Sequence, residues 1–162
     1  MIDLKRILIP TDFSDTSEAA LRYGVELARR FKARPYLFHV PPNPGEAAGA
    51  EYPLGIFEIM HNDAHDRLLG LLTDAEVAEL RPECAMRIGS PAEEIVKYAD
   101  DHQIDLIVLG THGRNGVARL LLGSVAESVV RKARCPVLTV HHPEHEFLAE
   151  EEPVRATYGA TT

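Results

Sequence analysis

The sequence contains no tryptophan and only two cysteines, Cys84 and Cys135, among its 162 residues. These cysteines lack the Cys-x-x-Cys spacing of redox and zinc motifs, and no cluster of other metal ligands accompanies them. Isolated thiols are typical of a reducing compartment, where disulfides are rare. We therefore expect two unpaired thiols and a cytoplasmic protein.

Long apolar runs and positive charge are also scarce. No apolar stretch approaches the roughly 18 residues that a transmembrane helix needs, and no leader-like apolar segment precedes the first expected strand. The formal net charge of −8 opposes general binding to nucleic acid or to anionic membranes. We therefore expect neither as a partner. The length suits one domain, residues 1–141, followed by an acidic tail, residues 142–162.

Three motifs of nucleotide-binding proteins and hydrolases are missing. The sequence has no GxxxxGK[ST] phosphate loop, no GxGxxG after the first expected strand and no GxSxG nucleophile turn. Histidines with metal-binding spacing occur twice, but neither group forms an identifiable ligand set: His61 with His65, and His141, His142 and His145 beside Glu144 and Glu146. A solvated helix face and a polar tail explain both groups better, so we expect no metal held by side chains.

Short β-branched runs alternate with amphipathic segments along the chain. The expected strands are Leu4–Ile9, Arg34–Val40, Glu83–Ile88, Asp105–Leu109 and Pro136–Val140. The expected helices run from Asp15 to Phe31, from Ile56 to Leu80 with an interruption near 70–73, from Ser90 to about His102, and from Ser124 onward. Capping boxes are expected at Asp15 with Glu18 and at Ser90 with Glu93. Residues 41–55 are too rich in proline and glycine for regular structure.

This alternation predicts a single doubly wound α/β domain with a five-stranded parallel sheet. In such sheets ligands bind outside the carboxyl ends of the strands, where the strand order reverses. If the first and fourth strands are neighbours, the segment Pro10–Asp12 and the segment beginning at Gly110 border that crevice. The topology, and not the spacing alone, decides this point.

Four glycines lie in the segment GTHGRNGVARLLLGS, from Gly110 to Ser124, between the fourth strand and the last helix. Glycine lets the backbone approach a ligand closely, and the first amides of a helix attract anions. Residues 110–134 carry five basic and one acidic side chain, a local charge of +4, and Arg114 and Arg119 belong to this group. These features predict a phosphate site.

A purely structural explanation of the same segment stays open. Ser124 and Glu127 have capping-box spacing, so Ser124 can serve its own helix while the glycines only turn the chain. The apolar run 120–122 is expected to anchor the loop to the core in either case.

The spacing of Gly110, Gly113, Gly123 and Ser124, G-x2-G-x9-G-[S/T], resembles the signature of ATP-binding universal stress proteins. The segments ILIPTDFSDTSEAAL, GSPAEEIVKYADDHQIDLIVLG and ARCPVLTV resemble the first strand and helix, the third helix with the fourth strand, and the closing strand of that family. The resemblance covers about residues 3–141. It implies a Rossmann-like fold of the adenine nucleotide alpha hydrolase type, strand order 3-2-1-4-5, and bound ATP with Mg²⁺ on its phosphates.

The resemblance also implies a role for each matching position. The nucleoside would lie against residues at the ends of three strands: Pro10, Thr11, Asp12, Val40, Leu109 and Gly110. Asp12 would contact the ribose hydroxyls, and the Val40 backbone would read the adenine edge. The phosphates would lie against Gly113, Gly123, Ser124 and Val125, and the positive charge of Arg114 would add to this cradle. Residues 41–55 and the acidic tail depart from the family pattern, which leaves specificity and regulation undetermined there.

Two residues near this loop, Asp12 and His112, have the chemistry of a general base, and neither has an identifiable partner in the sequence. We therefore expect a sensor or regulator that binds ATP with little or no hydrolysis and changes its contacts with an unidentified protein. The alternatives are a slow ATP hydrolase or adenylate-transferring enzyme, and a dimeric interaction protein that holds AMP or another small anion. The resemblance implies a homodimer joined through the strand Pro136–Val140.

Overall fold

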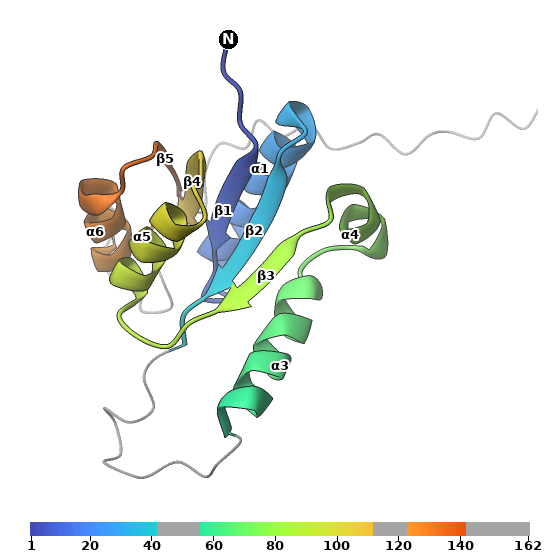
Figure 1. Ribbon diagram of the computed structural model, residues 1–162, viewed down its shortest axis with the longest axis vertical. Helices are drawn as coiled ribbons and strands as arrows, with labels where there is room; N and C mark the ends of the chain where they lie inside the picture. Colours follow the sequence, from blue (N-terminus) through green and yellow to red (C-terminus); the bar gives the residue numbers. More distant parts are fainter. Residues whose placement is uncertain (42–55, 112–122, 142–162) are drawn as a thin grey trace, which may run out of the picture.

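The computed structural model describes residues 1–41, 56–111 and 123–141 (Figure 1). Its strands are β1 (Arg6–Pro10), β2 (Arg34–His39), β3 (Glu83–Met86), β4 (Leu106–Gly110) and β5 (Val137–Val140). Its helices are α1 (Asp15–Phe31), α3 (Ile56–Leu69), α4 (Asp74–Leu80), α5 (Pro91–Asp101) and α6 (Ser124–Lys132). All five expected strands are present, and the long second helix is interrupted where the sequence predicts.

The strands form one parallel sheet in the order β3-β2-β1-β4-β5, which confirms the expected order. Strand β1 lies at the centre, with Ile7 opposite Pro35 of β2 on one side and Leu106 of β4 on the other. The residues Ile7 to Ile9 are fully buried. Strands covered on both faces are apolar throughout, which explains the unbroken ILIP run in β1.

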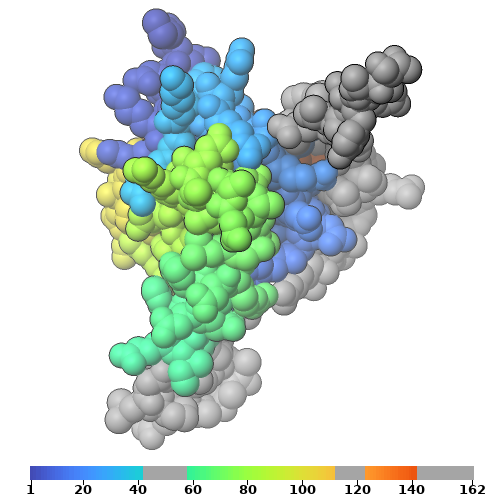
Figure 2. Space-filling model, turned by 90° about the vertical axis from the view of Figure 1, so that its right-hand side faces the viewer, coloured from blue at the N-terminus to red at the C-terminus, as the bar shows by residue number. Residues whose placement is uncertain are grey.

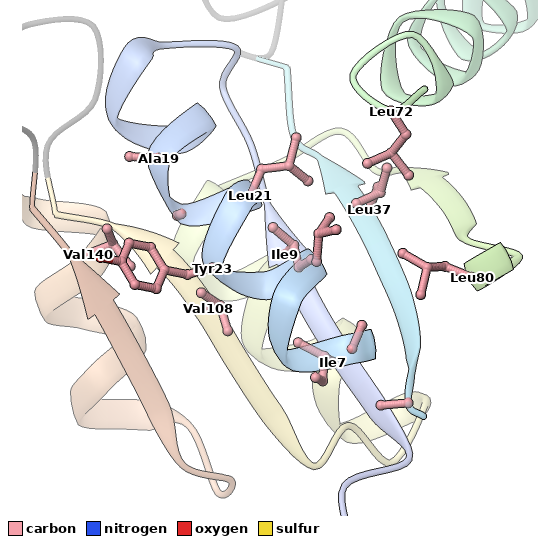
Figure 3. Close-up of a cluster of buried hydrophobic side chains, with 14 of the residues drawn as sticks. Ile7, Ile9, Ala19, Leu21, Tyr23, Leu37, Leu72, Leu80, Val108 and Val140 are labelled. Atoms are coloured by element: carbon pink, nitrogen blue, oxygen red, sulfur yellow. The ribbon is translucent and has the colours of Figure 1, made fainter. Parts of the chain in front are cut away.

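Alternate residues of each strand point to opposite faces of the sheet and build two separate cores. One core packs against α1, α3 and α4, and Figure 3 shows Ile7, Ile9, Leu37 and Val108 pointing into it. The other core packs against α5 and α6 and contains residues such as Leu8, Phe38, Ile107 and Leu109. The doubly wound arrangement therefore follows from the two-residue period of the strands.

Helix α1 lies close to the sheet because its inner face is built from small residues. A Cβ atom added at Gly24 would lie 2.5 Å from Cδ1 of Ile9, so a side chain at this position would require the Ile9 side chain to shift. Helix α3 packs at the other end of this face, on β3 and β2. In Figure 2 it forms the teal and green column along the lower edge of the molecule.

The strand ends differ from the expected ones by one or two residues. Strand β1 begins at Arg6 and not at Leu4, and β4 begins at Leu106 and not at Asp105. The side chain of Asp105 explains both differences, because its Oδ2 accepts hydrogen bonds of 2.8 Å from the backbone N–H groups of Lys5 and Arg6. Strands β2 and β3 end at His39 and Met86, and β5 begins at Val137.

The expected capping boxes were wrong at two helices. Ser14, and not Asp15, caps α1 by accepting a hydrogen bond from the N–H of Ser17. Ser90 precedes α5 but makes no capping bond, although Pro91 occupies the first turn as expected. A complete capping box joins Thr73 and Glu76 at the start of α4, where the sequence indicated only an interruption.

Candidate functional site

The C-terminal ends of β1 and β4 lie at the same edge of the sheet, because these parallel strands are direct neighbours. A Cβ atom added at Gly110 would lie 2.8 Å from both the carbonyl oxygen and Cγ2 of Thr16 in the first turn of α1. Glycine therefore lets the end of β4 reach the start of α1. Gly110, the first residue of the glycine segment, therefore lies beside the segment that follows β1.

The loop after β1, residues 11–14, is held by its own side chains. The buried hydroxyl of Thr11 accepts a 3.0 Å hydrogen bond from the N–H of Phe13 and lies 3.0 Å from the Ser17 hydroxyl. Oδ1 of Asp12 accepts a 3.0 Å bond from the N–H of Ser14 and a second bond from the Ser14 hydroxyl. These bonds fix the loop as a turn that leads directly into α1.

The same loop is attached to the end of β2. The N–H of Thr11 donates to the carbonyl of Phe38 at 2.9 Å, and Nδ1 of His39 lies 2.8 Å from the Thr11 carbonyl oxygen. That carbonyl can only accept, so Nδ1 carries the proton. Both backbone polar groups of Thr11 are therefore hydrogen-bonded to β2, which fixes the backbone that leads into Asp12.

The two ends of the glycine segment lie together. The N–H of Gly123 donates to the carbonyl of Thr111, which follows β4 directly, at 2.5 Å. The N–H of Thr111 in turn donates to the carbonyl of Val140 at the end of β5, and its hydroxyl lies 2.9 Å from Nδ1 of His141. The start of α6 is thus attached to the ends of β4 and β5.

Helix α6 begins without a side-chain cap. Gly123 occupies the capping position, and Ser124 is the first helical residue and makes no capping bond. The capping-box explanation of Ser124 and Glu127 is therefore wrong, because glycine supplies no oxygen to the first turn. The first intrahelical bond is donated by Glu127 to the Gly123 carbonyl, so the N–H groups of residues 124–126 have no partner within the helix. Such amides attract an anion.

The remaining expected nucleoside residues differ in exposure. Pro10 and Leu109 are buried, whereas Val40 is half-buried and packs against the core beneath α5 and α6. Val125 is half-buried and Ser124 is exposed, at the start of α6. The expected phosphate residues Gly113 and Arg114, together with Arg119, His112 and the run 120–122, lie outside the described residues.

The sequence motifs do not predict the structural roles of three residues at this edge. His39 holds the Thr11 carbonyl, Thr111 joins three elements, and Phe13 packs its ring against His39 with 4.7 Å between ring centroids. The Thr111 side chain is only 1% exposed, and this burial depends on the contacts of the folded chain. A threonine at the end of an apolar strand and beside a glycine motif is the only local hint of such a junction.

Other parts of the described chain offer weaker sites. A pocket of about 580 Å³ lies where α1 and α4 end, at the opposite edge of the sheet, but its Arg29 already pairs with Glu26, Glu76 and Glu79. No group of three or more potential metal ligands occurs among the described residues. His65 instead lies 3.6 Å from Asp66, with both side chains exposed.

The two cysteines are unpaired and lie away from this edge. Burial raises the pKa of the Cys84 thiol to about 11 and also raises that of Cys135. Neither thiol is therefore an activated nucleophile at neutral pH. Within residues 1–41, 56–111 and 123–141, no helix has the length and apolar character needed to cross a bilayer.

The sequence profile of the Universal stress protein family matches residues 3–141 of this chain. Universal stress protein MJ0531 of Methanocaldococcus jannaschii is 39% identical over 145 residues, which is 88% of this chain and 85% of that protein. The same organism provides a similar solved structure, that of MJ0577, with a TM-score of 0.69, 31% identity, and coverage of 89% of this chain and 100% of the other.

Two further similar structures contain adenine nucleotides. A universal stress protein in complex with cAMP has a TM-score of 0.57 and 28% identity, and the match covers 86% of this chain and 98% of that one. A universal stress protein from Archaeoglobus fulgidus in complex with dAMP has a TM-score of 0.55 and 25% identity, with coverage of 86% and 99%. Relatives with this fold therefore bind adenine nucleotides.

Proposed function

Since the chain belongs to the universal stress protein family, we propose that it binds ATP in the crevice at the C-terminal ends of β1 and β4. The observation that carries the proposal is the uncapped start of α6, whose amides have no partner within the helix and which is attached to Thr111 at the end of β4. The cAMP and dAMP complexes of similar proteins support an adenine nucleotide as the anion.

The nucleoside would lie between the two neighbouring loops. Asp12 would contact the ribose hydroxyls, Pro10 and Thr11 would form the floor under the adenine, and the Val40 backbone would pair with its edge. Leu109 and Gly110 would form the wall of the ribose pocket. Gly110 has a packing reason of its own, because any side chain there meets Thr16.

The phosphates would lie at the start of α6, against Gly123, Ser124 and Val125, with Gly113 and Arg114 completing the cradle. The helix dipole and three amides favour negative charge at this point. Mg²⁺ would accompany the phosphates and keep most of its water ligands, which suits a site without a cluster of carboxylates. We propose that the nucleotide domain spans residues 1–141.

The protein would act as a sensor or regulator and not as a fast enzyme. Oδ1 of Asp12 already accepts two hydrogen bonds from Ser14, which suits a fixed ligand contact better than a proton acceptor. A slow hydrolase remains the rival function, and a dimeric protein that binds AMP is the other. The unpaired, half-buried thiols support a reducing, cytoplasmic location.

We also propose a homodimer formed through β5. This strand is at the edge of the sheet, where unpaired backbone groups invite association. Leu138 of β5 and Val130 of α6 are large apolar side chains that are 37% and 46% exposed. Light scattering should give twice the chain mass, and Leu138→Lys should give the monomer.

The direct test is to denature purified protein and identify any released nucleotide, followed by calorimetry with ATP, ADP and AMP. Gly123→Val should weaken ATP binding at least about tenfold while the fold persists, because φ of −57° and ψ of 149° are accessible to valine. Ser128→Val, one turn further along α6, is the matched control and should bind like the wild type.

Each result has a definite meaning. Bound ATP in near-stoichiometric amount would support the sensor, whereas released ADP or AMP would favour the two rivals. A wild-type protein that neither retains nor binds any adenine nucleotide would show the proposal to be wrong.

A further inference from the structure

The backbone of Phe13 adopts a conformation that non-glycine residues rarely take. Its φ is 63°, in the left-handed region, and it stands in the loop between Asp12 and Ser14. A bulky residue persists in this region only when its surroundings hold it there, and such strain gathers at functional sites. The contacts of Phe13 therefore bear both on its own conformation and on that of the neighbouring Asp12.

Two side chains from distant parts of the sequence hold its ring. The His39 ring packs against it at 57°, with 4.7 Å between the centroids. On α3, the Cζ atom of Arg67 lies over the Phe13 ring, 3.9 Å from its centroid. We call Arg67, Phe13 and His39 the Phe13 clamp. A cation over an aromatic face and a ring contact are both attractive, so they oppose the backbone strain.

The clamp acts on both neighbours of Asp12. His39 also binds the carbonyl of Thr11, the residue before Asp12, at 2.8 Å. Phe13 is the residue after Asp12. The backbone on either side of Asp12 is therefore fixed by residues of β2 and α3, and its carboxylate points where the hydrogen bonds from Ser14 hold it.

We propose that the Phe13 clamp positions Asp12 for the nucleotide, and that Arg67 is the positioning residue through which helix α3 sets nucleotide affinity. This inference rests on the proposed function, because it assigns Asp12 to the ligand. Arg67 contacts the phenyl ring and lies 3.9 Å from Asp63 on its own helix. Arg67 holds the loop 11–14 in place, so replacing Arg67 lowers the fraction of molecules in which Asp12 is correctly placed.

The test compares Arg67→Met and Arg67→Lys with a matched control, Arg34→Met. Arg34 also places its guanidinium over a ring, that of Tyr36 at 5.9 Å, but at the start of β2, the opposite edge of the sheet. Arg67→Met should weaken ATP binding about three- to tenfold, since apparent affinity scales with the competent fraction. Arg67→Lys keeps a cation over the ring and should recover most of the affinity, and Arg34→Met should bind like the wild type.

A second ligand separates positioning from direct contact. If the clamp acts through Asp12, Arg67→Met weakens AMP and ATP by the same factor. If Arg67 instead touches the phosphates, ATP suffers more than AMP, and the inference is wrong. Phe13→Asn, which tolerates the left-handed conformation without a ring, should fold and should show the same equal loss for both ligands.

The remaining outcomes separate this inference from the function on which it rests. Wild-type binding with unchanged affinity in Arg67→Met and Phe13→Asn would overturn the clamp and leave the ATP site standing. A wild type that binds no adenine nucleotide would overturn both.

Discussion

The two helices that begin at the C-terminal edge of the sheet, α1 and α6, differ in how their first turns are capped. The loop 11–14 satisfies itself, because Thr11, Asp12 and Ser14 bind neighbouring backbone groups and cap α1. The start of α6 does not, because Gly123 has no side chain and Ser124 makes no capping bond. Among the described residues, a side chain caps the start of α1 and none caps the start of α6.

The two helix starts would contribute differently to the proposed site. A loop that is ordered in advance adds little ordering cost when a ligand arrives. In the proposed site, the amides of residues 124–126, which have no partner within the helix, would supply the attraction, because an anion can accept their hydrogen bonds.

The largest effect is expected where the end of β4 touches the first turn of α1, the helix that loop 11–14 leads into. Gly110→Ala places a Cβ atom 2.8 Å from the Thr16 carbonyl oxygen, and should lower the free energy of unfolding by about 1–3 kcal/mol, as overpacking does. Urea denaturation measures this. Gly24→Ala, whose obstacle is the side chain of Ile9, should cost less because a side chain moves more easily than backbone. Equal stability of Gly110→Ala and the wild type would show that β4 and α1 are not in tight contact.

A side-chain cap added at the start of α6 should make this helix start resemble that of α1. Gly123→Asp supplies an oxygen and a negative charge, and should raise the free energy of unfolding by about 0.5 kcal/mol. The same carboxylate competes with phosphate and should weaken ATP binding at least about tenfold. Denaturation and calorimetry on one sample measure both effects. Gly123→Asn, a neutral cap, should lose less affinity, and a stabilised variant with full affinity would contradict the phosphate cradle.

The smallest effects come from deleting one hydroxyl in each region. Ser14→Ala removes the cap of α1 and should cost about 1 kcal/mol of stability. Ser124→Ala removes a hydroxyl that caps nothing and should change stability by less than about 0.5 kcal/mol. Thermal unfolding of the two variants side by side is sufficient. Equal losses of stability in the two variants would show that the two serine hydroxyls contribute equally to their helix starts.

Periodicity was enough to predict the strands, the interrupted helix and the parallel sheet, because burial on two faces imposes apolar runs that any such fold must contain. Strand order and family came from the glycine spacing and neighbouring segments. Capping could not be predicted in the same way. Ser14 and Asp15 are both good caps by type, and the backbone geometry set by Asp12 decides between them.

The Phe13 clamp lay outside the reach of sequence reasoning for a different reason. A phenylalanine after Thr11 and Asp12 gives no sign of a left-handed backbone, and Arg67 is 54 positions away along the chain. Both facts depend on how α3 packs beside the end of β2. Long-range contacts of this kind are visible only when the chain is folded.

Thr111 gives the glycine segment a mechanical connection to the edge of the sheet. Its carbonyl holds the first turn of α6, its N–H holds the last residue of β5, and its hydroxyl lies against His141. Because Thr111 is buried and makes these three contacts, it cannot move without breaking one of them or moving the residues that it contacts. A displacement of α6 at its first turn is therefore shared by the end of β5, the strand whose outer edge has no neighbour among the described strands.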